Sequence, residues 1–200
     1  MITNNFNFKR HYIFEILNII NNIDLKKINL IENILLNKII LKKNIFVCGN
    51  GGSASIANHL YCDFNKSIKD SSRNILNPKI ISLVNNIEIM TAISNDISYS
   101  KIFSHQLENF ASKDDILLTF SCSGSSKNIL EVKKKAKKLK IKIINFTGFP
   151  NKLNNKKNEY NFNVGSYNYG VCEDVFQIIF HMMSQSIRNK YQKKNNINYF

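Results

Sequence analysis

The chain has 200 residues, 44% of them hydrophobic and 21% charged, which is enough for one globular domain with a sizeable core. It lacks a run of about 18 apolar residues, and the polar residues 1–9 do not resemble a signal peptide, so neither a membrane span nor secretion is expected. The four cysteines form no CxxC pair, which disfavours a disulfide framework or a zinc ribbon and favours reduced thiols in the cytoplasm.

A formal net charge of +14 would ordinarily suggest nucleic acid as a partner. Here lysine is abundant together with asparagine and isoleucine, as expected for an AT-rich genome, so the charge need not reflect selection. The clearest lysine run, at 133–140, has the pattern of the solvated face of an amphipathic helix. We therefore do not expect nucleic-acid binding, whereas the positive potential would attract a small phosphorylated substrate.

The first forty-odd residues predict two amphipathic helices. Apolar residues recur at helical spacing over 13–20 and again over 30–39. Asp24 lies between the two patterns and is expected to cap the second helix.

Short apolar runs then alternate with helical patterns, which predicts a parallel sheet with helices on both faces. The expected strands are Ile45–Cys48, Lys79–Val84, Ile116–Phe120, Ile141–Phe146 and Tyr160–Val164. A long helix is expected after Gly170, to about Tyr191. The predicted fold is thus α/β, a three-layer sheet of about five strands preceded by two helices. Residues 1–191 would form a single domain, with a surface loop at 151–157 and a polar tail at 192–200.

A glycine-rich turn, CGNGGS at 48–53, follows the first expected strand and precedes an apolar helix. Glycine permits a tight turn and close backbone approach, and the free N–H groups at the start of a helix attract anions. Many α/β proteins need such a turn for packing alone, so this motif by itself does not decide between packing and binding.

A serine-rich loop, SCSGSS at 121–126, stands between the third expected strand and a helix that begins near Lys127. Four hydroxyls around a glycine at a helix N-terminus can surround a phosphate group, and the helix dipole favours the same position. Simple N-capping would need only one serine. We therefore predict a phosphate site, at the carboxyl ends of the strands where open parallel sheets bind ligands.

A third group of residues has the spacing of a metal site. His59 and Asp63 are four residues apart and share one helical face. Glu173 and His181 are eight apart on the last helix, with Gln177 between them on the same side. Two imidazoles and two carboxylates suit zinc or a similar divalent ion.

The two loops, in this order, resemble the SIS (sugar isomerase) domain, and further segments resemble the phosphoheptose isomerases. The similar segments are GNGGSASIANH at 49–59, SND at 94–96, SCSGSS at 121–126, FTG at 146–148 and the carboxyl-terminal ED, Q and H. Their order is that of the family, and the resemblance covers essentially the entire chain.

This resemblance implies an aldose–ketose isomerase that converts sedoheptulose 7-phosphate to glycero-manno-heptose 7-phosphate through an enediol. It also implies one zinc ion per subunit and a homotetramer with sites at subunit boundaries. Whether the product enters lipopolysaccharide, capsule or another glycoconjugate stays open.

The resemblance assigns roles to individual residues. It places a phosphate clamp at Ser121, Ser123 and Ser126, and further substrate contacts at Asn50, Gly51, Gly52, Ser53, Asn95, Asp96, Cys122 and Glu173. The implied metal ligands are His59, Asp63, Glu173 and His181, of which Asp63 is also the expected base and His181 the acid. Two points stay open: whether Asp63 is a base, a ligand or both, and whether Glu173 or Gln177 is the fourth ligand.

Four positions depart from the better-known family pattern. Asp63 replaces a glutamate, Glu173 a glutamine, Cys122 a threonine, and Gly170 an aspartate that often contacts the sugar. These departures indicate a divergent branch. Two alternatives therefore remain: an isomerase or lyase for another sugar phosphate, and a non-enzymatic SIS-fold scaffold or regulator. A scaffold would have no physical reason to keep a metal constellation.

Overall fold

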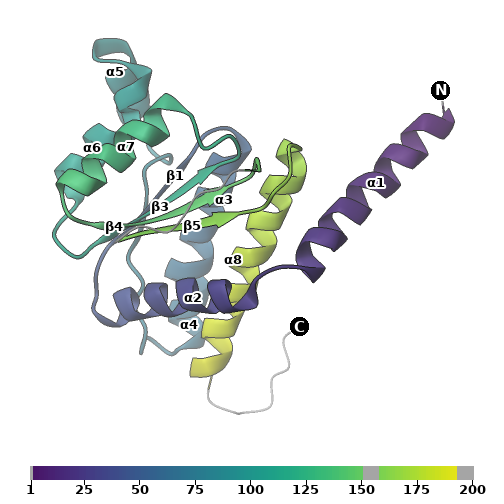
Figure 1. Ribbon diagram of the computed structural model, residues 1–200. Coiled ribbons are helices and arrows are strands. Elements are labelled where there is room, and N and C mark those ends of the chain that lie inside the picture. Colours follow the sequence, from purple (N-terminus) through teal and green to yellow (C-terminus); the bar gives the residue numbers. More distant parts are fainter. Residues whose placement is uncertain (1, 151–157, 193–200) are drawn as a thin grey trace.

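Five parallel strands form one sheet in the order β2-β1-β3-β4-β5 (Figure 1). The computed structural model describes residues 2–150 and 158–192, so the predicted loop at 151–157 and all of the predicted tail except Gln192 lie outside it. The strands are β1 (Ile45–Gly49), β2 (Ile80–Ser82), β3 (Ile116–Ser121), β4 (Lys142–Thr147) and β5 (Glu159–Asn163). The predicted α/β class and parallel sheet are confirmed.

The central strands are buried on both sides, which explains their almost continuous apolar runs. Along β3, Leu118 and Phe120 point to one face and Leu117 to the other. The edge strand β2 is shorter than predicted. Its pairing with β1 ends in a turn, where the Leu83 N–H still donates to the Val47 carbonyl at 2.9 Å.

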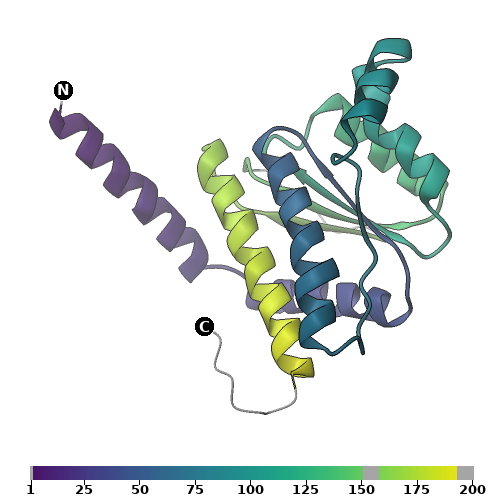
Figure 2. The ribbon, with the colours of Figure 1, turned by 180° about the vertical axis from the view of Figure 1, so that it is seen from behind.

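Helices cover both faces of the sheet (Figures 1 and 2). The helices on one face are α2 (Leu25–Ile40), α3 (Gly52–Cys62) and α8 (Tyr169–Tyr191), and those on the other are α5 (Ile87–Asp96), α6 (Ile102–Phe110) and α7 (Lys127–Lys138). Helix α3 continues through a π-helical turn, η1 (Asp63–Ile68), into α4 (Lys69–Ser71), and a 3₁₀ turn, η2 (Tyr99–Lys101), precedes α6.

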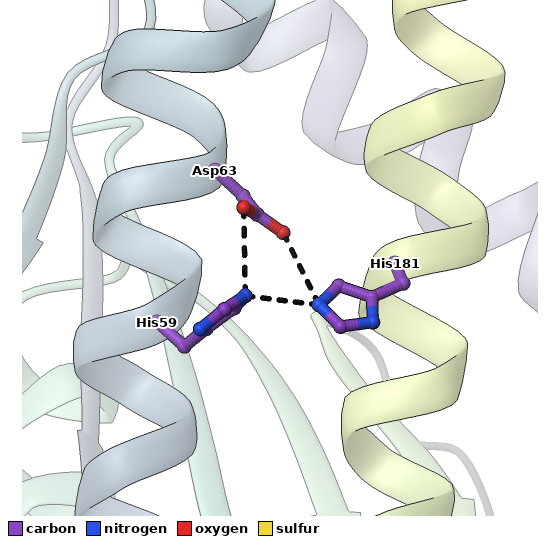
Figure 3. A group of neighbouring side chains, drawn as sticks. All are labelled: His59, Asp63 and His181. Carbon is purple, nitrogen blue, oxygen red and sulfur yellow. Dashed lines mark hydrogen bonds and ion pairs between the residues drawn. The ribbon is translucent and has the colours of Figure 1, made fainter. Parts of the chain in front are cut away.

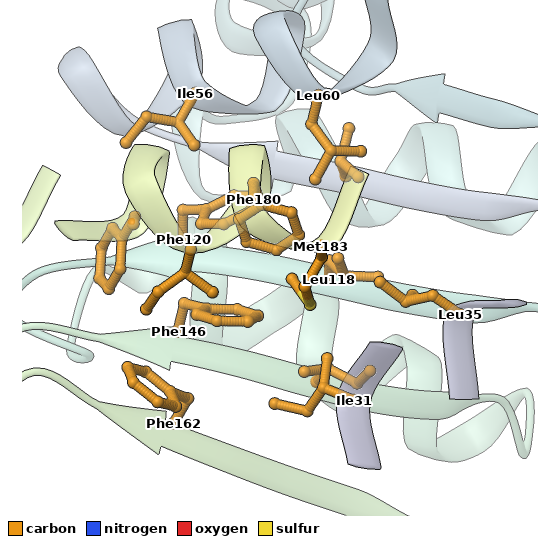
Figure 4. Packing of buried hydrophobic residues seen from close by; sticks show 14 of the residues in the cluster. Ile31, Leu35, Ile56, Leu60, Leu118, Phe120, Phe146, Phe162, Phe180 and Met183 are labelled. Carbon is orange, nitrogen blue, oxygen red and sulfur yellow. The ribbon is translucent and has the colours of Figure 1, made fainter. Parts of the chain in front are cut away.

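Stacked phenylalanines form the core between the sheet and α8 (Figure 4). Phe120 on β3 and Phe146 on β4 have ring centroids 5.5 Å apart, and Phe180 of α8 lies 5.1 Å from the first and 4.8 Å from the second. These spacings are those of favourable aromatic pairs. This packing holds α8 against the sheet, and α8 carries several of the predicted site residues.

Helix α1 (Ile2–Asn21) extends away from the sheet and its covering helices (Figures 1 and 2). It is attached through Tyr12, whose hydroxyl donates to Asp174 Oδ2 of α8 at 2.6 Å. Desolvation, together with the nearby carboxylate of Asp174, raises the pKa of Tyr12 to about 12, so this hydroxyl stays a donor at neutral pH. After α1, Asp24 caps α2 as predicted, accepting from the Lys27 N–H at 3.1 Å.

The lysine run at 133–140 lies largely on α7, and part of it faces neighbouring carboxylates. Lys135 pairs with Glu108 of α6 at 2.7 Å, and Lys133 pairs with Glu159 of β5 at 3.2 Å. Several lysines of the run are thus engaged within the chain. Within the described residues, no helix combines the length and the apolar character that a membrane span requires.

Candidate active site

The order of the strands determines where a ligand site can form. Strands β1 and β3 are neighbours, with Gly49 opposite Phe120, although β2 comes between them in the sequence. The connections from these two strands leave toward opposite faces, because α3 covers one face and α7 the other. Open parallel sheets bind ligands at such a switch point, beyond the carboxyl ends of the strands. The glycine turn and the serine loop both lie there.

The glycine turn brings α3 close to α8. Gly51 has a φ of 54°, a left-handed conformation that glycine adopts without strain. A Cβ atom on Gly52 would lie 2.1 Å from Oε2 of Glu173, so a side chain at this position would displace the carboxylate from the turn. Glu173 Oε1 accepts a hydrogen bond from the Ser53 hydroxyl at 3.1 Å. Glu173 therefore lies against the glycine turn.

The serine loop presents hydroxyls at the N-terminus of α7. Gly124 has a φ of 68°, and its N–H donates to the Ser121 hydroxyl at 3.1 Å. Ser126 occupies the N-cap position, yet its side chain makes no capping hydrogen bond to α7. Capping alone therefore does not account for the Ser126 hydroxyl, which lines the pocket described below.

A pair of amides joins the two loops. The Asn50 amide donates to Asn128 Oδ1 at 2.9 Å, and the Asn128 amide donates to Asn50 Oδ1 at 2.8 Å. The Tyr99 hydroxyl also donates to Asn50 Oδ1, at 3.0 Å. Because Asn128 is almost fully buried in the first turn of α7, this pair fixes the glycine turn relative to the serine loop.

The two loops line one pocket of about 330 Å³. Its lining residues are Asn50, Gly51, Gly52, Ser53, Phe120, Ser121, Cys122, Ser123, Ser126, Tyr169 and Glu173. All of the predicted substrate-contacting residues except Asn95 and Asp96 are among them. Those two are exposed at the end of α5, where the Asn95 amide donates to Asp96 Oδ1 at 2.9 Å, so this chain does not bring them to the pocket.

Sequence reasoning did not single out four residues of this region: Asn128, Tyr99, Phe120 and Tyr169. Asn128 lies two residues beyond the serine motif, where an asparagine in the first helical turn has no distinctive pattern. Tyr99 comes from a segment far from both loops in sequence. Only the folded topology shows that these side chains meet at the loops.

His59, Asp63 and His181 converge between α3 and α8 (Figure 3). The two Nε2 atoms of the imidazoles are 2.9 Å apart. Asp63 Oδ1 lies 3.5 Å from His59 Nε2, and Asp63 Oδ2 lies 3.7 Å from His181 Nε2. Both imidazoles are nearly half exposed, so solvent and ligands can reach them. Asp63 begins the π-helical turn, a feature that often marks functional sites.

The donor set fits a zinc ion. Ligands bound at about 2.0–2.1 Å in a tetrahedron are roughly 3.3–3.4 Å from one another. Here the two imidazole nitrogens are 2.9 Å apart, and one ligand atom from each of the three residues lies within 4.8 Å of the others, so small side-chain movements would complete the geometry. Gln177 lies beside this group, with its amide nitrogen 2.8 Å from His181 Nε2. Glu173 lies apart from it, against Ser53. The geometry therefore brings together three of the four predicted ligands. Of the two candidates for the fourth, Gln177 is the one that lies beside them, and a rotation of its amide would present the oxygen to the group.

Comparisons with known proteins agree with these observations. A sequence model described as SIS domain matches residues 11–148. The chain is 31% identical to a phosphoheptose isomerase of Helicobacter pylori over 76% of this chain and 77% of that one. The phosphoheptose isomerase structure from Francisella tularensis is 25% identical with a TM-score of 0.77, covering 95% of this chain and 98% of that one. The Neisseria gonorrhoeae phosphoheptose isomerase has the same fold, with a TM-score of 0.82 at 22% identity, covering 94% and 100%.

The serine loop generates a binding prediction. Replacing both Ser123 and Ser126 with alanine should weaken binding of inorganic phosphate about tenfold or more, because each lost hydrogen bond contributes roughly 0.5–1.5 kcal/mol. Isothermal titration calorimetry measures the affinity. Ser125→Ala is the matched control, because Ser125 belongs to the same loop but is not among the residues that line the pocket. If the double variant and the wild type bind inorganic phosphate with equal affinity, these serines do not bind phosphate and the loop serves only to begin the helix.

Proposed function

This chain belongs to the SIS-domain family and, within it, to the phosphoheptose isomerases, and from that premise we propose that it interconverts sedoheptulose 7-phosphate and glycero-manno-heptose 7-phosphate. The observation that supports this most is the meeting of the serine loop and the glycine turn around one pocket at the N-terminus of α7. Backbone N–H groups, hydroxyls and the helix dipole there suit a phosphate group. The rest of the sugar then has to extend past Ser53 and Glu173.

Helices α3 and α8 run side by side (Figure 2), and His59 and His181 meet between them (Figure 3). On α3, His59 follows Ser53 by six residues, about 9 Å along the helix; on α8, His181 follows Glu173 by eight, about 12 Å. A phosphorylated sugar that spans this distance would have Ser53 and Glu173 near one end and the two histidines near the other. This arrangement favours an extended substrate with its phosphate at one end.

The isomerisation moves a proton between C1 and C2, which requires a base near those carbons and an acid at the carbonyl oxygen. We propose Asp63 as the base and His181 as the acid, since the two side chains lie 3.7 Å apart and are both reachable from solvent. Glu173 is the carboxylate that lines the pocket itself. We assign it to orienting the sugar hydroxyls, together with Ser53, which it already holds by a hydrogen bond.

We further propose that His59, Asp63 and His181 hold a zinc ion, with Gln177 completing the site. When bound, zinc would act as a Lewis acid on the carbonyl oxygen and would orient the sugar hydroxyls. A carboxylate that binds a metal loses basicity, so Asp63 serves as a base only where its second oxygen stays free of the ion. With Nε2 on the ion, His181 serves as an acid only through its other ring nitrogen, Nδ1. The same donor set disfavours the alternative of a non-enzymatic scaffold, because a scaffold would not need two histidines and an aspartate in contact.

We also propose a cytoplasmic homotetramer. All four cysteines are free, as is usual in a reducing compartment. Helix α1 exposes Phe6, Phe8 and Phe14 at 58%, 60% and 67%. Apolar patches of this kind on a projecting helix mark association surfaces, and a second copy of the chain is the partner expected for a closed symmetric assembly.

The substrate assignment is tested with purified protein and sedoheptulose 7-phosphate, following aldose formation by NMR in the presence of zinc. We expect turnover of the heptulose and little or none of a hexulose phosphate at the same concentration. A variant with Asp63→Asn should lose nearly all turnover, because the amide cannot accept the proton, whereas Glu173→Gln should retain part of it. Turnover of the hexulose phosphate without turnover of the heptulose would contradict the heptose assignment and identify another sugar phosphate as the substrate.

The zinc proposal is tested by metal analysis. We expect close to one zinc ion per chain. Replacing either His59 or His181 with alanine should weaken zinc binding by about 10–100-fold or more, because mutating even a residue that only hydrogen-bonds to a metal ligand typically lowers metal affinity by that factor. Gln177→Ala should lose more zinc than Glu173→Ala, its matched control on the same helix. Chelation should abolish turnover while circular dichroism stays unchanged. Full activity of the metal-free protein would contradict the proposal.

The assembly is tested by light scattering, where we expect a mass four times that of the 23.1 kDa chain. Phe14→Asp should dissociate the assembly, because it places a charge in the apolar surface of α1. Ile75→Asp is the control: Ile75 is also 67% exposed but lies outside α1. A wild-type protein that stays monomeric at micromolar concentration would be incompatible with the tetramer.

A further inference from the structure

Two cysteines meet behind the serine loop. Cys122 lies within the loop, between Ser121 and Ser123, and lines the pocket. Cys172 lies in the first turn of α8 and is fully buried. Although fifty residues separate them in sequence, both lie against Gly148. The Cys172 thiol donates to the Ser166 carbonyl at 3.2 Å, and the Cys122 thiol donates to the Tyr169 carbonyl at 3.9 Å.

Gly148 provides the room for this contact. A Cβ atom there would lie 2.4 Å from the Cys172 sulfur and 3.0 Å from the Cα atom of Cys122. The Cys172 sulfur thus occupies the space that a side chain at 148 would need, directly against the serine loop. Disulfide formation requires the two Cα atoms to lie within about 7 Å, and two cysteines that crowd the same glycine are candidates for such a pairing.

The two thiols differ in reactivity. The neighbouring Cys172 side chain lowers the pKa of the Cys122 thiol, whereas the neighbouring Cys122 side chain and burial raise the pKa of Cys172. The thiolate is the reactive form, so Cys122 is the thiol that an oxidant would meet first. The other two cysteines differ: burial raises the pKa of Cys48, and Cys62 lies on the exposed surface of α3.

We propose that the Cys122–Cys172 pair is a peroxide-sensitive modification site that closes into a disulfide and disables the phosphate loop. The Cys122 thiolate attacks hydrogen peroxide, so that an S–O bond forms, the O–O bond breaks, and the departing hydroxide takes a proton to become water. The Cys172 sulfur then attacks the resulting sulfenic acid. An S–S bond forms, the S–O bond breaks, and the second hydroxide leaves as water with the proton of Cys172. Two thiols lose two electrons in total, and one peroxide is reduced to two waters.

Closing this bond would move the loop that carries the phosphate-binding hydroxyls. The Cys122 carbonyl accepts from the N–H groups of Gly148 at 3.0 Å and Phe149 at 2.7 Å, so the loop is held at the end of β4. A disulfide needs its sulfurs about 2.05 Å apart, which draws the Cys122 side chain toward α8 and changes the positions of Ser121 and Ser123. The loss of activity rests on the proposed function, whereas the disulfide itself does not.

The test treats the full-length protein with hydrogen peroxide and maps the cysteines by mass spectrometry under non-reducing conditions. We expect a peptide pair joined through Cys122 and Cys172, with the loss of two hydrogens. Turnover of sedoheptulose 7-phosphate should fall by most of its initial value as this pair forms, and should return with dithiothreitol. Cys172→Ser should keep its basal activity and form no disulfide, and its Cys122 sulfenic acid should become trappable by dimedone.

Cys62→Ser is the matched control and should respond to peroxide as the wild type does. Absence of the Cys122–Cys172 peptide pair in oxidised wild type would overturn the proposal, and so would an unchanged phosphate affinity in protein that carries the disulfide. The peptide map needs no substrate. A protein that forms the disulfide but does not turn over the heptulose would therefore contradict the proposed function but not the proposed modification site.

Discussion

Strands β1 and β3 exchange hydrogen bonds along their length, with Gly49 opposite Phe120, and this pairing sets the position of the two loops that line the pocket. It makes the glycine turn and the serine loop neighbours although about 70 residues separate them in sequence. It also directs α3 to one face of the sheet and α7 to the other, so that the N-termini of both helices open at the same edge. A site for an anionic group follows from this topology before any side chain is considered.

The second constraint is the close approach of α3 and α8. Gly52 lets the Glu173 carboxylate approach the start of α3, and the phenylalanine stack holds α8 against the sheet. From that contact the two helices continue as neighbours, and His59 meets His181 further along (Figure 3). The pocket and the histidine group therefore lie at two positions along the same pair of helices, α3 and α8. A change in the packing of α8 would affect both.

Much of this arrangement can be predicted from local patterns. The five strands, the Asp24 cap and the two loops follow from apolar runs, turn residues and helix starts, all of which are short-range signals. The helical spacing of His59 and Asp63 likewise predicts a shared face, and the two side chains are in contact. On the last helix, spacing alone cannot choose between Glu173 and Gln177, because both lie on the side of His181. The choice depends on the height at which α3 crosses α8, which is a tertiary property. For the same reason nothing near Asn128 predicts its partner Asn50.

The reciprocal bonds between Asn50 and Asn128 involve only neutral amides. Elsewhere this strongly cationic protein has exposed ion pairs such as Lys66 with Asp70, whose attraction weakens as salt is added. An amide pair has no net charge to screen and no proton to lose between acid and alkaline conditions. The alignment of the two loops is thus insulated from ionic strength and acidity. Changes in ionic strength would act on the ligand and on the exposed ion pairs, while the amide link between the two loops is not affected.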